Sequence, residues 1–312
     1  MVVLMGIDGG GTFTRVAAAD TQGRLLAHVK RQGGAFLLKD ANANENVRLT
    51  VLAALEEAGC GPSDVIALAA GIAGYDKKRD LRWVRKLTEI EGLRCVVQHA
   101  NDAVVAHRGA LLFRPGIVAI AGTGSIILGI TEKGKLVRNY DFRQYVNNSA
   151  SHLTHSCVER ILAGETDDTD FTDKLLRHFG AENINALKSQ RQKERKLYGN
   201  FAPEVTAAAL NGSRIAGQVC ERAAEETVEG IRLLGGRFAS SPVPVALVGS
   251  AANSEFMKHA VGEMLHGEGK FALVEPALPP ALGAVLMAAQ LAGIEIEPFQ
   301  KNLIASYLEK GE

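Results

Sequence analysis

The sequence has little of several features that mark specialised classes of protein. Its 312 residues contain only 4 cysteines and 1 tryptophan, and its 35 basic residues balance its 35 acidic residues. Balanced charge argues against nonspecific binding to nucleic acid or to a membrane surface, because both need a basic face. No apolar run approaches the length of a membrane span. We therefore expect no nucleic-acid partner and no membrane partner.

The few cysteines are also widely spaced. Cys60, Cys95, Cys157 and Cys220 form no C-x-x-C pair, so neither a disulfide framework nor a zinc site is indicated and reduced, mostly buried thiols are expected. The apolar stretch at the start of the chain is short and meets Asp8 at once, unlike a signal peptide. A cytoplasmic protein is therefore the expectation.

Glycine, in contrast, is abundant, with 33 residues. Two glycine-rich corners organise the chain, Asp-Gly-Gly-Gly-Thr at 8–12 and Gly-Thr-Gly-Ser at 122–125. Each corner lies between two apolar runs, and a polar turn and a third short apolar run follow. The pattern predicts that one strand–corner–strand unit occurs twice.

Both corners have the composition of a phosphate-binding loop. Glycine has no side chain and can adopt φ > 0, so successive N–H groups can converge on an anion. Thr12, Thr123 and Ser125 add hydroxyl donors, and Asp8 ends a predicted strand where a carboxylate beside phosphates can hold Mg²⁺. One glycine hairpin alone is weak evidence, because such hairpins are common. Two that face one another predict a phosphate clamp.

Strands alternate with helices elsewhere, which predicts an α/β fold with a mostly parallel sheet and function at the carboxyl ends of strands. The predicted strand Val65–Ala70 leads into Gly71–Gly74, and the predicted strand Arg94–His99 leads to Asn101 and Asp102. Further elements are predicted as helices at 80–90, 156–162, 172–179, 215–234, 255–265 and 281–291 and as strands at 243–248 and 271–274. The charged run 190–196 is predicted to be a solvated helix face.

The order of these landmarks resembles that of actin-like, hexokinase-type ATPases. The landmarks are residues 8–12, Asn-Asp at 101–102, residues 122–125, Gly-Ser at 249–250 and Ala-Leu-Gly-Ala at 281–284. Within that superfamily the chain resembles the BadF/BadG/BcrA/BcrD ATPase family, which includes N-acetylglucosamine and glucosamine kinases. The resemblance implies two ribonuclease-H-like domains with a nucleotide cleft between them. These are 1–113, completed by a C-terminal helix at 288–312, and 114–287, with hinges at 114–116 and before Ala281.

The resemblance also assigns roles to residues, with ATP and Mg²⁺ as cofactors. Asp8 resembles the Mg²⁺-associated aspartate, and Asp102 resembles the catalytic base that accepts a proton from a sugar hydroxyl. The implied ATP and phosphate contacts are Gly10, Gly11, Thr12, Gly122, Thr123, Gly124, Ser125, Gly249 and Ser250. The implied substrate contacts are Asn101, Gly71, Gly74, Asn148 and Ser149. Asp102 could instead cap the helix that starts at Ala103, and the two roles are compatible.

The acceptor side departs from the family pattern. Where family sugar kinases have Gly-Asp-Glu-Gly-Ser, this chain reads Asn-Asn-Ser-Ala-Ser at 147–151. The amide of Asn148 and the hydroxyl of Ser149 can still bond a polyol, but they would discriminate a hexosamine less well. His152 and His155 follow, three residues apart. They lack a nearby acidic or cysteine partner, so surface or sugar-contact histidines are favoured over a metal pair.

Three functions remain open. The favoured one is an ATP-dependent kinase for a sugar, above all an amino sugar such as N-acetylglucosamine or glucosamine, because Asp102 is retained. The second is a nucleotide- or sugar-binding regulator without efficient transfer, which the altered acceptor segment supports. The third, an ATP-driven activator of a radical dehydratase, is disfavoured because no cysteine has a matching Cys-Gly-Ala-Arg context. A small-molecule sugar partner is implied, and the resemblance also allows a homodimer.

Overall fold

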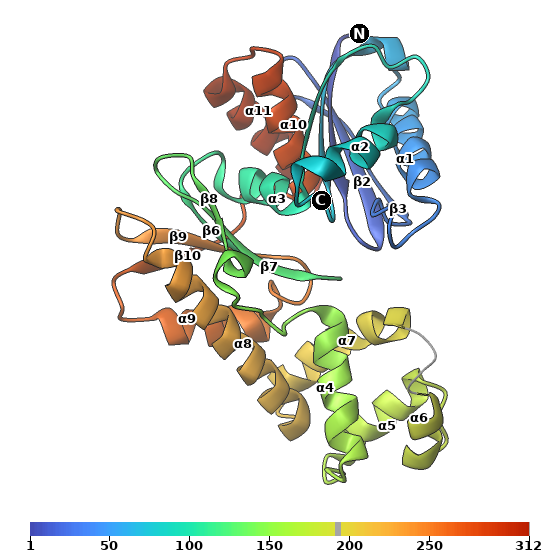
Figure 1. The fold of residues 1–312 in the computed structure, drawn as a ribbon, viewed down its shortest axis with the longest axis vertical. Helices are drawn as coiled ribbons and strands as arrows, with labels where there is room; N and C mark the ends of the chain where they lie inside the picture. Colours follow the sequence, from blue (N-terminus) through green and yellow to red (C-terminus); the bar gives the residue numbers. More distant parts are fainter. Residues whose placement is uncertain (191–194, 312) are drawn as a thin grey trace. The chain divides into compact units, whose positions relative to one another are not determined.

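The computed structural model describes residues 1–190 and 195–311, which divide into two compact units. The first unit consists of Met1–Arg114 together with Glu275–Glu312, and the second is Pro115–Val274 (Figure 1). The chain thus leaves the first unit at the predicted break 114–116 and returns to it shortly before Ala281.

The first unit is a five-stranded mixed sheet with helices on both faces. Its elements are β1 (Val3–Gly9), β2 (Phe13–Asp20), β3 (Leu25–Gln32), α1 (Ala43–Glu57), β4 (Val65–Ile72), α2 (Leu81–Val84), β5 (Val96–Asn101), α3 (Asp102–Leu111), α10 (Pro280–Leu291) and α11 (Ile296–Glu309). The strand order is β3-β2-β1-β4-β5. Strand β2 is antiparallel to both of its neighbours, β1 and β3, whereas β4 and β5 are parallel to β1.

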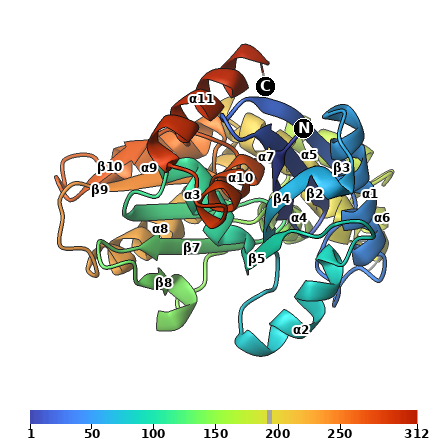
Figure 2. The ribbon, with the colours of Figure 1, turned by 90° about the horizontal axis from the view of Figure 1, so that it is seen from above.

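The central strand β1 is buried along its whole length because both faces of the sheet are covered. Val3, Met5 and Ile7 belong to the apolar cluster that includes α1, whereas Leu4 belongs to the cluster that includes α10. Helices α3 and α10 pack side by side, as Figure 1 and Figure 2 show. A side chain at Gly6 would lie 2.3 Å from the carbonyl oxygen of Ala281, so this glycine lets α10 approach the sheet.

The second unit repeats the strand order of the first. Its elements are β6 (Gly116–Ala121), β7 (Ser125–Ile130), β8 (Leu136–Arg138), α4 (Ala150–Leu162), α5 (Thr169–His178), α6 (Ile184–Gln190), α7 (Arg195–Leu210), α8 (Arg214–Gly235), β9 (Val243–Val248), α9 (Glu255–Leu265) and β10 (Phe271–Val274). The order is β10-β9-β6-β7-β8. Strand β7 is antiparallel to both of its neighbours, β6 and β8, whereas β9 and β10 are parallel to β6. This duplication confirms the predicted α/β fold and the repeated strand–corner–strand unit.

Some predicted elements need correction. The segment 288–312 is not one helix, because α10 ends at Leu291, Gly293 turns the chain with φ of +75°, and α11 follows. The return to the first unit comes before α10 rather than at 288, since Ala281 to Ala289 are buried in that unit. The predicted helix 80–90 breaks into α2 and a 3₁₀ turn, Arg85–Thr88.

The region 143–200 is more helical than predicted. Helix α4 begins at Ala150 rather than at 156, and most of α6 and α7 lies outside the helix predicted at 190–196. The side chains of the charged run 190–196 lie outside the described residues. Within the described part of the chain, no helix combines the length and the apolar character that crossing a membrane requires.

Candidate functional site

The first glycine corner joins β1 to β2. The N–H of Gly10 donates to the carbonyl oxygen of Phe13 at 3.1 Å, which closes the turn around Gly11 and Thr12. A second loop supports it, since the N–H of Gly33 donates to Thr12 O at 2.9 Å and that of Ala35 to Gly10 O at 3.0 Å. The corner is therefore held by backbone hydrogen bonds on both sides.

Asp8 lies in β1, just before this corner, and is 6% exposed. Its Oδ2 accepts a hydrogen bond from Nη1 of Arg15 at 3.1 Å, and Arg15 is the residue opposite Asp8 on β2. Burial raises the pKa of Asp8, and the Arg15 guanidinium opposes that rise. A single buried carboxylate beside a glycine corner that is predicted to bind phosphate fits Mg²⁺, which keeps several waters and takes one or two carboxylates plus phosphate oxygens.

Asp102 is the first residue of α3, directly after β5. The register of the sheet aligns Asp8 on β1 with Gly71 on β4 and Ala100 on β5. Asp102 follows Ala100 by two residues, so it lies just beyond this row of aligned residues. Burial, followed by the negative charge of Asp8, raises the pKa of Asp102 to about 7. A carboxylate with a pKa near the working pH suits general base catalysis.

Helix α3 is capped by the residue before Asp102. Oδ1 of Asn101 accepts from Ala103 N at 2.9 Å, and Oδ1 of Asp102 accepts from the same N–H at 3.0 Å. Asn101 occupies the N-cap position, with Asp102 in a secondary role. The Nδ2 of Asn101 donates to Tyr75 O at 3.3 Å and to Asp76 Oδ1 at 3.2 Å. Asn101 thus ties the loop after β4 to the start of α3, and its substrate contact stays a prediction.

The two predicted substrate glycines of the first unit have clear packing reasons. A side chain at Gly71 would lie 2.2 Å from Cγ2 of Val105 on α3, so this glycine lets α3 pack closely over β4. Gly74 has φ of +80°, and a side chain there would lie 2.6 Å from the ring of Phe36. Both glycines shape the surroundings of Asp102, and packing alone explains them, so their contact with a substrate stays a prediction.

The second corner joins β6 to β7. The N–H of Gly122 donates to Gly124 O at 3.0 Å, and Thr123 is exposed between them. A side chain added at Gly122 or Gly124 would meet no atom within 4 Å, so the two glycines border open space. Packing therefore does not require either glycine, and their contact with a ligand stays a prediction.

Two further loops meet this corner. Gly249 has φ of +94°, and a side chain there would lie 2.5 Å from Ala121 O, so the Gly249–Ser250 turn sits directly against the end of β6. On the other side, Oγ of Ser125 donates to Val146 O at 2.7 Å, and Ala150 N donates to Gly122 O at 2.8 Å. The predicted acceptor segment 147–151 is thereby hydrogen-bonded to the corner, through Ala150 and through the preceding residue Val146.

Within the acceptor segment, Asn148 is 1% exposed. Its Nδ2 donates to Oγ1 of Thr227 on α8 at 2.8 Å, which favours a structural role over the predicted sugar contact. Ser149 is the N-cap residue of α4 and is 9% exposed. Sequence reasoning missed Thr227 and also Glu226, whose Oε2 accepts from Asn147 N at 2.8 Å. No local pattern links α8 to a segment so distant in the chain.

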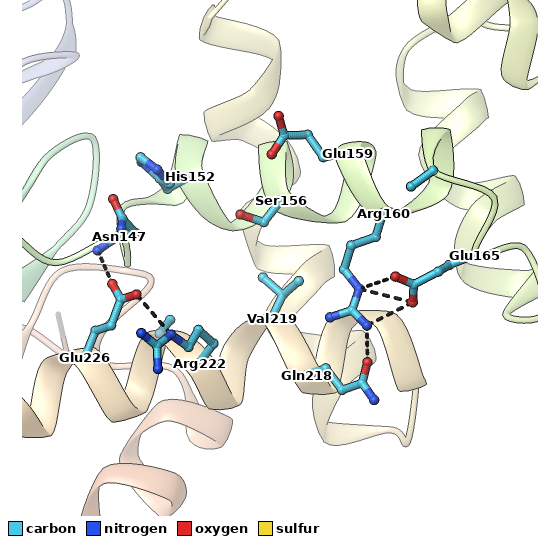
Figure 3. Close-up of a pocket in the computed structure, with 12 residues that line it drawn as sticks. Asn147, His152, Ser156, Glu159, Arg160, Glu165, Gln218, Val219, Arg222 and Glu226 are labelled. Carbon is cyan, nitrogen blue, oxygen red and sulfur yellow. Dashed lines mark hydrogen bonds and ion pairs between the residues drawn. The ribbon is translucent and has the colours of Figure 1, made fainter.

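A polar groove lies between α4 and α8, beside this segment (Figure 3). It has a volume of about 470 Å³, and its lining includes Asn147 and Glu226 at one end and His152 on α4. His155 pairs with Glu159, with 3.5 Å between Nδ1 and Oε2. Among the described residues no group of three or more histidine, cysteine, aspartate or glutamate side chains is arranged to hold a metal ion.

The predicted site residues thus form two sets. The first unit holds Asp8, Gly10, Gly11, Thr12, Gly71, Gly74, Asn101 and Asp102, and the second holds Gly122, Thr123, Gly124, Ser125, Asn148, Ser149, Gly249 and Ser250. Two units with one strand order, each with a glycine corner in its first hairpin, define an actin-like ATPase fold of the kind found in sugar kinases.

Solved structures share this fold. A protein from Chromobacterium violaceum assigned as an N-acetylglucosamine kinase matches with a TM-score of 0.75 and 22% identity, over 92% of this chain and 99% of that one. A ROK family glucokinase from Streptomyces griseus, solved with glucose and AMPPNP, matches with a TM-score of 0.64 and 19% identity, over 93% and 98%.

The sequence profile of the BadF/BadG/BcrA/BcrD ATPase family matches residues 5–288, and the chain belongs to that family. Glucosamine kinase GspK of Vibrio cholerae is 25% identical over 228 residues, which are 71% of this chain and 76% of that protein. N-acetyl-D-glucosamine kinase of Dictyostelium discoideum is 32% identical over 146 residues, but these are only 42% and 44% of the two chains.

Proposed function

We propose that this protein is an ATP-dependent kinase that transfers the γ-phosphoryl group of ATP to a hydroxyl group of an amino sugar. The observation that carries the proposal is the placement of Asp102. Asp102 lies at the carboxyl end of β5, where the negative charge of Asp8 helps to raise its pKa. The relatives of this chain include glucosamine and N-acetylglucosamine kinases.

The proposed chemistry uses Asp102 as the general base. Its carboxylate accepts the proton of the sugar hydroxyl as that oxygen bonds to the γ-phosphorus and the bond from phosphorus to the ADP oxygen breaks. A raised pKa favours this role, because the carboxylate binds the proton more strongly than an ordinary aspartate does. Asn101 positions Asp102 by capping α3 and by its bonds to the loop after β4.

The remaining predicted residues would hold ATP. The corner at 10–12 and the open glycines Gly122 and Gly124 would receive phosphate oxygens, and the Gly249–Ser250 turn would lie beside the nucleoside. Bound Mg²⁺ would neutralise phosphate charge during transfer, and Asp8 would hold it. In the protein without bound ligand, the hydrogen bond from Arg15 holds the Asp8 carboxylate in one orientation.

The cellular setting follows from the same chemistry. ATP is an intracellular substrate, and the four cysteines are free thiols, with burial raising the pKa of Cys157 and of Cys220. A cytoplasmic kinase is therefore part of the proposal, and the homodimer stays a prediction. Burial of Cys157 and Cys220 also disfavours their use as cluster ligands in an activator of a radical dehydratase.

The test is ADP release from the purified protein with Mg-ATP across glucosamine, N-acetylglucosamine, glucose and other amino sugars. Asp102→Asn keeps the shape of the side chain and should abolish sugar-stimulated release while ATP still binds. Glu297→Gln, a change of the same kind at an exposed ion pair on α11, should leave release unchanged. ATP binding without stimulation by any sugar would instead support the regulator.

A further inference from the structure

The acceptor segment presents no carboxylate of its own. The positions where family sugar kinases have an acidic pair hold Asn148 and Ser149. The Asn148 side chain is buried against Thr227, and Ser149 starts α4. Any acidic recognition group on this side of the second unit must therefore come from another element.

Helix α8 supplies such a group. Oε2 of Glu226 accepts from the N–H of Asn147 at 2.8 Å, so a carboxylate lies directly at the altered segment. Its other oxygen, Oε1, accepts from Nε of Arg222 at 3.2 Å, and the side chain is 13% exposed. Glu226 is thus held in one orientation, and each oxygen retains capacity for a further hydrogen bond.

Glu226 faces the groove between α4 and α8, as Figure 3 shows. At the far end, Arg160 binds Glu165 and Gln218, so its guanidinium is already bonded within the protein. At the near end, Glu226 and Asn147 lie beside His152. A volume of about 470 Å³ falls within the range of about 300–1,000 Å³ that small-molecule sites occupy.

The lining of the groove contains three carboxylates, Glu159, Glu165 and Glu226, and two guanidinium groups, Arg160 and Arg222. Arg160 pairs with Glu165 and Arg222 with Glu226, and Arg222 contacts only one oxygen of Glu226, so the carboxylate can still accept a hydrogen bond from a ligand. A protonated amine forms a charge-assisted hydrogen bond with a carboxylate, which is about twice as strong as a neutral one. An acetamido group carries no charge and would gain much less from the same carboxylate.

We propose that Glu226 is the acceptor-recognition carboxylate of this protein, and that the α4–α8 groove binds an amino sugar with a free amine in preference to its N-acetyl form. This inference rests on the proposed sugar kinase function for its choice of ligand class. In family sugar kinases the acidic residue that contacts the sugar lies in the loop before the helix that corresponds to α4. Here Glu226 on α8, 79 residues after Asn147, would provide the carboxylate instead.

The test is calorimetric binding of glucosamine and of N-acetylglucosamine to the whole protein without nucleotide. Glu226→Gln removes the charge but keeps an oxygen for the Asn147 N–H, and it should weaken glucosamine binding about tenfold or more, with a smaller loss for N-acetylglucosamine. Glu225→Gln is the matched control, because Glu225 also pairs with Arg222, at 3.1 Å, but does not line the groove. It should leave both affinities unchanged.

Three results would overturn the inference. They are equal losses for the two sugars, equal effects of the two variants, and no binding of glucosamine to the wild type at millimolar concentration. A lowered unfolding midpoint in Glu226→Gln with both sugars weakened alike would assign Glu226 to holding Asn147 only. Because no ATP is present, glucosamine binding that depends on Glu226 would stand even if no sugar stimulated ADP release, which separates this test from that of the kinase.

Discussion

Asp102→Asn removes a charge that the folded protein holds at a cost. The pKa of Asp102 rises from an ordinary 3.8 to about 7, first through burial and then through the charge of Asp8. Between these two pH values the folded chain keeps a proton that the unfolded chain has lost. Stability therefore falls as pH rises from 3.8 to about 7, and the full penalty applies above pH 7.

The size of the penalty follows from the two pKa values. Their difference, 7 − 3.8 = 3.2 units, corresponds to at most about 4 kcal/mol at about 1.4 kcal/mol for each unit. The asparagine introduced by Asp102→Asn cannot ionise, and its side-chain oxygen can still accept from the Ala103 N–H. The variant should therefore be more stable than the wild type at pH 8 by up to about 4 kcal/mol, with the gain vanishing near pH 4.

This gain is measured by comparing the thermal unfolding midpoints of the variant and the wild type at pH 4, 6 and 8. In a domain of about the size of the first unit, each kcal/mol shifts the midpoint by about 2–4 °C. Glu297→Gln, measured beside them, should show no gain that grows with pH. An Asp102→Asn variant with the same midpoint difference at every pH, or one less stable than the wild type at pH 8, would show that ionised Asp102 does not destabilise the fold. In the wild type, sugar-dependent kcat/KM should rise with pH through about 7, because only the ionised carboxylate accepts a proton.

Three further experiments separate functional from structural residues. Arg15→Gln removes the cation that pairs with Asp8, so the Mg²⁺ concentration for half-maximal ATP binding should fall, and an unchanged or higher value would contradict the pairing. Gly71→Ala should cost about 1–3 kcal/mol in chemical denaturation, and adding Val105→Ala should recover most of it, unless the close contact between β4 and α3 is unimportant. Gly122→Ala should weaken ATP binding about tenfold at unchanged stability, whereas Gly249→Ala should lower the unfolding midpoint because of its φ of +94°; the reverse pattern would exclude a ligand at Gly122.

Much of the fold is predictable because its signals are local. Strand β9 and helix α9 have the predicted bounds, since an apolar run and an amphipathic period each identify an element within its own sequence. The two glycine corners are recognisable for the same reason. The end of α10 is predictable too, because the helix predicted at 281–291 stops at Leu291 as observed, and only the single helix at 288–312 that the resemblance implied is wrong.

The acceptor side is less predictable because its contacts are distant in sequence. The place of Asn148 in the segment predicts a sugar contact, but Thr227 turns its side chain into the protein. Glu226 and Arg15 are ordinary charged residues in their own elements, and only the pairing of those elements places them beside Asn147 and Asp8. A single sequence contains no record of such pairing.

The division of the chain also sets the order in which its parts can be completed during synthesis. The second unit is one continuous segment, Pro115–Val274, so all of it has left the ribosome before the first unit has its last helices. Strand β1 is synthesised before the second unit, but its packing is complete only when α10 follows, because the Ala281 carbonyl packs onto Gly6. The nascent first unit therefore exposes the apolar face around Leu4 until α10 has been synthesised. A deletion that reaches into α10 would disrupt the packing of β1 and leave the second unit intact.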